Sequence, residues 1–238
     1  MLSVDGVSVL RGKATTLSNV SLTLEAGRTL AVVGESGAGK STLIGAILGL
    51  LKPSAGLITW KGAPVAACKP SLVMQEPRAA FNPRLSLRHS VMEPVRHQTP
   101  PPRLTRLCAG LELPETLLDR KPGEVSIGQA QRVGILRSLI SSSPLVLFDE
   151  PLSALDAVTQ KRTARLIAEL QREEGFAALI VTHDIGYAVA HADEIAVLKS
   201  GRIEEIAPSQ TFARDPQSGY GRTLRDAAIS LGGLEAVA

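Results

Sequence analysis

Hydrophobic and polar residues alternate along the first part of the chain with the two-residue period of half-buried β-strands. The strands predicted there cover residues 2–10, 20–24 and 29–33, the last a continuous apolar run typical of a buried strand. After a glycine-rich turn the period becomes helical over residues 40–51, and we expect Pro53 and Gly56 to end that helix. Two more short strands are predicted at residues 57–60 and 72–75.

The pattern changes at residue 76, where helical stretches replace strands up to residue 141. We interpret residues 76–141 as a helical subdomain inserted into a single α/β domain that spans residues 1–238. Strands then alternate with a helix, with strands predicted at residues 145–148, 177–181, 194–198 and 202–206 and the helix at residues 157–173. We expect a short helical tail at residues 209–238 and a mainly parallel sheet flanked by helices.

Composition places the chain among ordinary globular proteins. Its 238 residues are 44% hydrophobic and 21% charged, which is enough apolar material for a sizeable core and excludes disordered and fibrous classes. The formal net charge of +3 is too small to indicate a nucleic-acid partner, and two cysteines, Cys68 and Cys108, are too few for a disulfide framework. No apolar run approaches the roughly 18 residues that a membrane span needs.

The glycine-rich turn at residues 34–41, GESGAGKS, matches the pattern G-x-x-x-x-G-K-[ST] in full and lies between a predicted strand and a predicted helix. Glycines let backbone N–H groups turn inward around phosphate oxygens, and a helix N-terminus favours negative charge. We predict that Lys40 reaches the β- and γ-phosphates of a nucleotide and that Ser41 binds Mg²⁺. The residues predicted to bind the nucleotide here are Gly34, Glu35, Ser36, Gly37, Ala38, Gly39, Lys40, Ser41 and Thr42.

A later predicted strand ends in two acids, Asp149 and Glu150, at the edge where open α/β sheets bind ligands. An ordinary strand terminus is the alternative interpretation, but the phosphate loop elsewhere in the chain favours a metal–nucleotide site. In such a site Asp149 would orient Mg²⁺ through its water shell, and Glu150 would polarise the attacking water.

Kinases, GTPases and recombinases share these two elements, so the discriminating segment is residues 125–129, VSIGQ. This segment resembles the L-S-G-G-Q signature of ATP-binding-cassette (ABC) ATPases, with Ile127 in place of the first signature glycine. Ser126 has the position of an N-cap before a helix predicted at residues 129–139, and a capped helix N-terminus can receive a γ-phosphate. The resemblance implies that the ATP-binding residues of this segment are Ser126, Gly128 and Gln129.

Other landmarks of the same family follow in order, and the resemblance covers residues 2–224. Gln75 ends a predicted strand at the position of the family's Q-loop glutamine, Asp156 falls in a D-loop-like segment, and His183 matches the switch histidine. The resemblance implies catalytic roles for Gln75, Glu150 and His183 and a Mg²⁺ site at Ser41, Gln75 and Asp149. It also implies a P-loop ABC ATPase fold, with a mixed, mainly parallel core sheet, an N-terminal antiparallel β part and the inserted helical subdomain.

Two further implications concern the nucleotide. The family usually stacks an aromatic side chain on adenine, and our alignment gives that position to Arg11, whose guanidinium can also stack on a base. A solvated surface residue is the alternative interpretation of Arg11. In this family ATP is sandwiched between two cassettes, so Ser126 and Gly128 would complete the site of a partner chain.

Two segments are similar to the peptide and nickel importer branch of the family, the Q-loop region at residues 75–94 and the tail at residues 215–224. Importers of this branch pair two different ATPase subunits with two transmembrane permease subunits and an extracytoplasmic substrate-binding protein. The resemblance therefore implies a hetero-dimeric partner cassette, attachment to the cytoplasmic face of the membrane through permeases, and import of nickel, metal chelates or di- and oligopeptides. We expect no nucleic-acid partner.

Two alternatives stay open. Residues 77–107 contain six arginines and one glutamate, which indicates either a solvated face or a surface that docks a membrane subunit. The chain could also be the ABC-type ATPase subunit of a soluble enzyme assembly, such as a phosphonate-cleaving complex, whose cassettes resemble this branch. Co-purification with permease chains or with soluble enzymes would separate the two functions.

Overall fold

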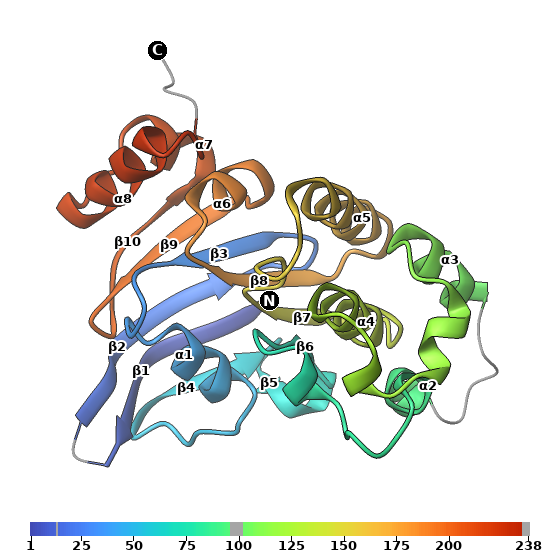
Figure 1. The fold of residues 1–238 in the computed structure, drawn as a ribbon. Helices are drawn as coiled ribbons and strands as arrows, with labels where there is room; N and C mark the ends of the chain where they lie inside the picture. Colours follow the sequence, from blue (N-terminus) through green and yellow to red (C-terminus); the bar gives the residue numbers. More distant parts are fainter. Residues whose placement is uncertain (13, 96–101, 235–238) are drawn as a thin grey trace.

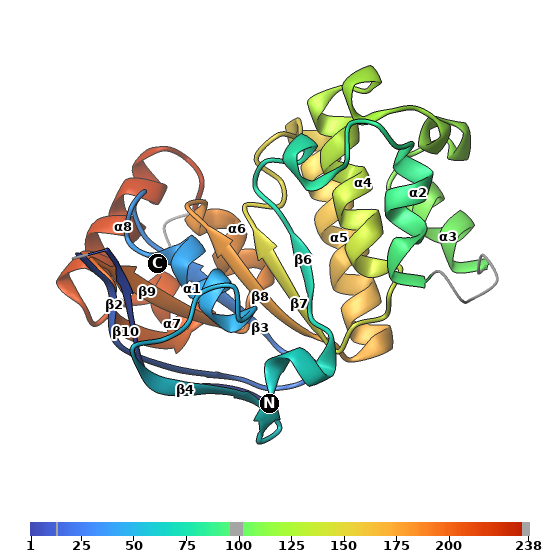
Figure 2. The same ribbon diagram turned by 90° about the horizontal axis from the view of Figure 1, so that it is seen from below.

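Helix α1 (Lys40–Ile47) packs between two β-sheets, and further helices cover the other face of the larger sheet (Figure 1 and Figure 2). This computed structural model describes residues 1–12, 14–95 and 102–234. Residues 96–101 of the predicted insertion and residues 235–238 of the predicted tail lie outside the described residues. In the described part of the chain, none of the helices combines the length and the apolar character needed to cross a membrane.

The smaller sheet is antiparallel and comes from the N-terminal part of the chain. Its strands, in spatial order, are β2 (Ala14–Leu24), β1 (Leu2–Arg11), β4 (Ala55–Trp60) and β5 (Ala63–Pro64). Alternate residues of β1 face the core, and an irregularity between Val4 and Val7 shifts that alternation by one residue. The strand predicted at residues 20–24 is only the second half of β2. The first half of β2 was missed because it is mostly polar and exposed, yet it still pairs with β1.

The larger sheet is mixed and mainly parallel. Its strands, in spatial order, are β10 (Arg202–Pro208), β9 (Glu194–Lys199), β3 (Thr29–Val33), β8 (Ala177–Thr182), β7 (Leu145–Asp149) and β6 (Ser71–Val73). Only the pairing of β10 with β9 is antiparallel among these described strands. The predicted mixed sheet with an antiparallel N-terminal part is therefore confirmed, together with the helical insert.

The helices of the insert share one apolar core with a face of the larger sheet. They are α2 (Leu87–Met92), α3 (Pro102–Gly110) and α4 (Ile127–Leu139), joined by short 3-10 turns at Arg78–Ala80, Glu93–Val95, Glu115–Asp119 and Pro122–Glu124. Helix α5 (Ala157–Glu174) packs beside them, and Figure 2 shows the four helices gathered on one side of the molecule. Fully buried Leu107 and Ile135 belong to the same cluster as Phe148 of β7, so the insert is anchored on the strand that carries the acids.

The C-terminal helices pack on the opposite end of the sheet (Figure 1). They are α6 (Ile185–His191), α7 (Ser209–Arg214) and α8 (Gly219–Ser230), and their core includes Phe212, Tyr220 and Ile195. The hydrophobic pattern did not predict α6, because a helix of seven residues has too few turns to show a period. The boundaries that we assigned to the insertion and to the tail remain predictions.

Two predicted element ends, those of α1 and β6, are wrong. Helix α1 ends at Ile47, well before Pro53, because Gly49 takes a left-handed conformation with φ +73° and its N–H donates to the Ala46 carbonyl. The Leu50 N–H donates to the Gly45 carbonyl at 2.9 Å, which completes a Schellman motif. Strand β6 ends at Val73, so Gln75 lies in the turn beyond the strand.

Candidate functional site

Four neighbouring strands of the larger sheet end along one edge, and each is followed by residues that the sequence analysis selected. They lie in the order β6, β7, β8 and β3 and are parallel. Val33 at the end of β3 pairs with Thr182 at the end of β8, and Asp149 at the end of β7 pairs with Val181. Because the strand ends are level, the loops that follow them meet above the same edge of the sheet.

These loops enclose a cavity of about 550 Å³ that holds most of the predicted site. Its lining residues are Arg11, Thr16, Ser36, Gly37, Gly39, Lys40, Ser41, Thr42, Gln75, Asp149, Glu150 and His183. Thr16 is the one lining residue that sequence analysis missed, since a threonine within a strand has no distinctive pattern. Arg11 reaches the cavity from the end of β1, so its position is compatible with the stacking role predicted for it.

Lys40 is the buried cation of the cavity. Its ammonium donates hydrogen bonds to the carbonyl oxygens of Gly34 at 2.7 Å and Glu35 at 2.9 Å, so the side chain curls back over the phosphate loop. Burial lowers the pKa of Lys40, while the carboxylates of Glu150 and Asp149 oppose that shift. A desolvated ammonium beside backbone N–H groups and a helix N-terminus forms a site for a polyanion.

Two glycines let the phosphate loop pack closely against other elements. Gly39 has φ +109°, and a Cβ there would lie 2.8 Å from the carbonyl oxygen of Thr16 on β2. A Cβ at Gly34 would overlap the carbonyl oxygen of Leu198 at the end of β9. The glycines of this motif therefore serve close backbone packing as well as the shape of the phosphate cradle.

The two acids at the end of β7 have different surroundings. Burial raises the pKa of Asp149; the Ser41 hydroxyl opposes that shift and the nearby charge of Glu150 adds to it. Glu150 adopts a left-handed backbone conformation with φ +47°, and its N–H donates to the Val181 carbonyl of β8 at 2.9 Å. Non-glycine residues rarely adopt this conformation, and here it ends the strand and turns the next segment away from the sheet.

His183 interacts directly with Glu150. Its Nδ1 lies 3.0 Å from Oε1 of Glu150, in hydrogen-bonding contact across two adjacent strands. The side chain of His183 is 68% exposed and that of Glu150 only 14% exposed. His183 is therefore not a core residue, and the imidazole faces the cavity.

The donor set of the cavity fits a magnesium ion held together with a nucleotide. Within the described residues there is no cluster of three or more His, Cys, Asp or Glu side chains that could hold a metal by itself. Mg²⁺ usually takes one or two carboxylates, keeps several waters and shares its remaining ligands with substrate phosphates. Asp149 and the Ser41 hydroxyl interact directly, so a carboxylate and a hydroxyl lie together beside Lys40.

The signature residues do not line this cavity. Ser126 caps α4, since its Oγ accepts from the Gln129 N–H at 3.1 Å and its own N–H donates to Gln129 Oε1 at 2.9 Å. This reciprocal capping box starts the helix at Ile127, two residues before the predicted start. Asp156 likewise caps α5 by accepting from the N–H groups of Val158 and Thr159.

The signature segment packs closely against the D-loop-like segment. A Cβ at Gly128 would lie 3.2 Å from the carbonyl oxygen of Ala154, so a glycine allows this approach. Nearby, the buried Gln131 of α4 donates from Nε2 to the Pro151 carbonyl at 2.8 Å, one residue after Glu150. The sequence analysis did not select Gln131, because its partner lies on another element.

Several arginines of residues 77–107 bind other parts of the chain instead of forming a free basic face. Their partners are the Val125 carbonyl for Arg78, Asp119 for Arg88, Glu174 for Arg103 and Glu173 for Arg106. Acids outside this segment therefore compensate much of its positive charge.

Sequence comparison finds an extended match to transport proteins. A family described as ABC transporter matches residues 17–153. The nickel import ATP-binding protein NikE of Shigella dysenteriae serotype 1 (strain Sd197) is 35% identical over 232 residues, covering 90% of this chain and 85% of that protein. The oligopeptide transport ATP-binding protein OppF of Escherichia coli (strain K12) is 34% identical over 228 residues, covering 89% of this chain and 68% of that protein.

Solved structures share the fold. The ATP-binding subunit of an ABC transporter superposes with a TM-score of 0.81 over 97% of both chains at 24% identity, a likeness that concerns the fold alone. The ATP-binding cassette MJ0796, in a dimeric post-hydrolysis state bound to ADP and Pi, gives a TM-score of 0.79 at 27% identity and covers 88% of this chain and 99% of that one.

Proposed function

The chain belongs to the ABC transporter family, and from that premise we propose that it energises an importer of nickel, metal chelates or di- and oligopeptides by hydrolysing ATP. One observation carries the proposal: the phosphate loop, Asp149, Glu150 and His183 line a single cavity at the carboxyl edge of the sheet. The substrate class is supported by relatives that are named for nickel import and for oligopeptide transport.

Four residues of the cavity have direct roles in this proposal. Lys40 exchanges its carbonyl partners for oxygens of the β- and γ-phosphates, where its charge stabilises the charge that develops during phosphoryl transfer. Glu150 accepts the proton of the attacking water, and His183 orients the Glu150 carboxylate and contacts the γ-phosphate. Gln75, in the turn after β6, would contact the water and help to hold the metal.

Ser41, Gln75 and Asp149 would hold Mg²⁺ in this proposal, which agrees with the donor set described above. The bound ion would neutralise charge on the β- and γ-phosphates.

A second cassette would complete the ATP site. Ser126 and Gly128 do not line the cavity of their own chain, and they lie at the N-terminus of α4, which has 13 residues. A capped helix N-terminus of this length favours the negative charge of a phosphate. We therefore assign Ser126, Gly128, Gln129 and Asp156 to the face that meets a partner cassette, with a different ABC ATPase as that partner.

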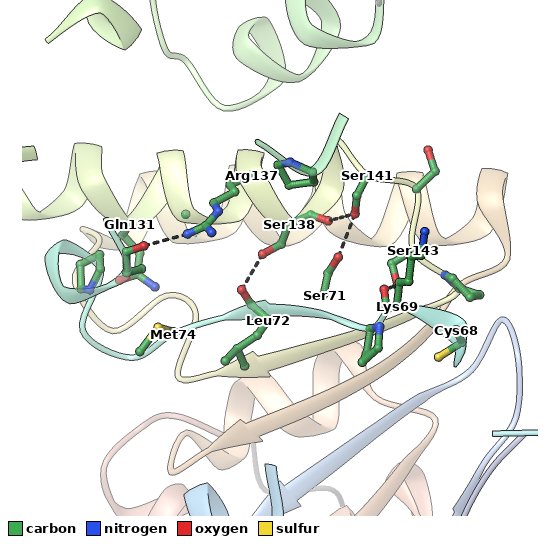
Figure 3. A pocket seen from close by; sticks show the side chains of 17 residues that line it. Cys68, Lys69, Ser71, Leu72, Met74, Gln131, Arg137, Ser138, Ser141 and Ser143 are labelled. Atoms are coloured by element: carbon green, nitrogen blue, oxygen red, sulfur yellow. Dashed lines mark hydrogen bonds between the residues drawn. The ribbon is translucent and has the colours of Figure 1, made fainter. Parts of the chain in front are cut away.

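A groove between β6 and α4 is the proposed contact with a permease subunit, which would hold the chain at the cytoplasmic face of the membrane (Figure 3). Its volume is about 600 Å³, and its described lining contains no acid but two cations, Lys69 and Arg137, the second of which is paired with Glu93 at 3.2 Å. Hydrogen bonds from Ser138 Oγ to the Leu72 carbonyl at 2.7 Å, and between the hydroxyls of Ser71 and Ser141 at 2.8 Å, hold its walls together. An acidic or neutral loop of a membrane protein suits this lining.

The groove and the nucleotide cavity are adjacent along the backbone. Met74 lines the groove and its neighbour Gln75 lines the cavity. Gln131 also lines the groove and holds the Pro151 carbonyl next to Glu150. A segment seated in the groove would therefore press on two residues that adjoin the catalytic machinery.

Uptake of radiolabelled nickel in native cells tests the proposal. Cells carrying Glu150→Gln should lose nickel uptake while a pull-down still recovers the assembled complex. If uptake and assembly are both unchanged, the nickel assignment is wrong, and labelled di- and oligopeptides are tested in the same cells.

Co-purification from detergent-solubilised membranes tests the partner class. Permease chains should accompany the wild-type chain and be lost with Met74→Glu, which places a carboxylate in the groove and repels an acidic loop. Leu231→Glu, at a position that is 86% exposed, is the control. Recovery of soluble enzymes in place of permeases would favour the alternative function, the ATPase subunit of an assembly such as a phosphonate-cleaving complex.

A further inference from the structure

The C-terminal part of the chain holds the phosphate loop from outside. The Glu35 N–H donates a hydrogen bond to the Tyr220 hydroxyl oxygen at 3.0 Å, and this bond joins residues that are 185 positions apart. Tyr220 lies in the first turn of α8 and is only 8% exposed. The Lys199 ammonium lies 4.6 Å from the centroid of its ring, in a cation–π arrangement.

The start of α8 is itself anchored, so Tyr220 has a defined position. Ser218 caps the helix by accepting from the Gly221 N–H at 2.8 Å. The Glu205 carboxylate of β10 accepts from the N–H groups of Gln217 and Ser218. These bonds tie the first turn of α8 to a strand of the larger sheet.

The tyrosine contact continues into the phosphate loop through Glu35. The Glu35 N–H points outward to Tyr220, while its carbonyl oxygen accepts from the Lys40 ammonium at 2.9 Å. The peptide group that joins Gly34 to Glu35 carries both the N–H bound to Tyr220 and the carbonyl bound to Lys40. Rotation of this peptide would therefore change the loop at both contacts. Burial raises the pKa of Tyr220, so its hydroxyl is neutral at physiological pH, and in that form its oxygen accepts from the Glu35 N–H.

We propose that Tyr220 is a positioning residue of the nucleotide site: by holding the Glu35 N–H, it keeps the backbone of the phosphate loop in the geometry that receives the phosphates of ATP. Helix α8 thereby sets the affinity of the site without contacting the nucleotide. The inference rests on the proposed ATP-binding function of the phosphate loop. By reciprocity, nucleotide binding must change the stability of the contact between α8 and the loop.

Tyr220→Phe tests the proposal, because it removes the accepting oxygen and keeps the ring. We expect the dissociation constant of Mg-ATP, measured by calorimetry on the full chain, to rise between about threefold and tenfold. The ¹⁵N-resolved amide of Glu35 should exchange with solvent faster and shift in the NMR spectrum. Tyr187→Phe is the matched control: it removes the same atom from α6, and Tyr187 does not line the nucleotide cavity.

An unchanged dissociation constant together with an unchanged Glu35 amide would overturn the inference. A second measurement needs no variant: amides of residues 219–230 in the wild-type chain should shift during titration with Mg-ATP, at the same concentrations that saturate the phosphate loop. Saturation of the loop without a response in α8 also overturns it. If the wild-type chain binds no ATP at all, the proposed function itself has failed, which is a distinct result.

Discussion

Nδ1 of His183 lies 3.0 Å from Oε1 of Glu150, although the two residues follow different strands, β8 and β7, and are 33 positions apart. The contact follows from the pairing of β7 with β8, because the Glu150 N–H also donates to the Val181 carbonyl at 2.9 Å. Both side chains line the cavity, and the histidine is the more exposed of the two, so in the proposed mechanism the imidazole orients the carboxylate and also faces the nucleotide. The two side chains therefore form one unit in the proposed mechanism.

Replacing Glu150 by glutamine should stop turnover without stopping binding. An amide cannot take up a proton from water, so we expect steady-state ATP hydrolysis to fall by about 100-fold or more while the Kd for ATP changes little. Turnover assays and nucleotide calorimetry on the same preparation check this. Glu204→Gln, at an exposed position of β10, should retain wild-type turnover. Wild-type turnover in Glu150→Gln would remove Glu150 from the proposed role.

His183→Ala should lower turnover with little effect on stability. Because the imidazole is 68% exposed, we expect the free energy of unfolding to change by less than about 0.5 kcal/mol. The fold-loss of turnover in the double variant His183→Ala/Glu150→Gln should be much smaller than the product of the two single fold-losses, because the residues act as a unit. Multiplicative losses would show that the two side chains act independently.

Asp149→Asn should stabilise the nucleotide-free protein at neutral pH. Burial raises the pKa of Asp149 above the ordinary carboxyl value of about 3.9, so its contribution to stability is present below that pH and is lost as the pH rises through the raised folded-state pKa. Asparagine removes this pH-dependent loss. We therefore expect Asp149→Asn to have a higher Tm than the wild type at pH 7, and this difference in Tm should become smaller toward pH 4. We also expect the variant to bind Mg-ATP more weakly.

Differential scanning calorimetry without nucleotide, at steps from pH 4 to pH 7, measures this difference. Asp5→Asn changes an exposed carboxylate on β1 and serves as the control, for which we expect no such gap. A Tm for Asp149→Asn below that of the wild type at pH 7 would contradict the prediction. The result bears on a general trade-off, since a desolvated carboxylate kept for metal binding costs stability in the free protein.

Two glycine-to-alanine substitutions should have opposite effects. At Gly39 the added Cβ would lie 2.8 Å from the Thr16 carbonyl oxygen in a backbone with φ +109°, so we expect destabilisation by about 2 kcal/mol or more and loss of ATP binding. At Gly134, inside α4, the Cβ would meet nothing within 4 Å, so alanine should stabilise the chain by roughly 0.5–1 kcal/mol. Chemical unfolding of both variants checks this pair, and a stable Gly39→Ala would contradict the close packing.

Much of the candidate site was predictable because its elements are local. Residues 34–41 form a phosphate loop through their own backbone preferences, and the N-cap of α4 at Ser126 was predicted from short-range pattern alone. Boundaries were less predictable. The glycine that ends α1, Gly49, does so through hydrogen bonds within the last turn, and the more obvious Pro53 plays no part in it.

Other features required knowledge of non-local partners. The arginines of residues 77–107 suggested one basic face, but Arg88, Arg103 and Arg106 form ion pairs with Asp119, Glu174 and Glu173 on other elements. The hydrogen bond between Tyr220 and Glu35 could not be predicted, although the sequence analysis selected both segments, because a motif does not show which distant residue its side chains contact. A tyrosine in an amphipathic helix is ordinarily a core residue, and only the hydrogen bond with Glu35 indicates a positioning role for Tyr220.

The sequence by itself determined the chemistry of this protein: the phosphate loop, the acids that end a buried strand, the capped signature helix and the family to which they belong. Those features depend on backbone conformations and hydrogen bonds among near neighbours, which short segments encode directly. Only the tertiary structure decided which segments meet. The strand order β6–β7–β8–β3 brings four loops to one edge, places His183 against Glu150 and lets α8 reach the phosphate loop. Strand order and side-chain pairing arise from packing between residues far apart in the chain, and no local pattern specifies that packing.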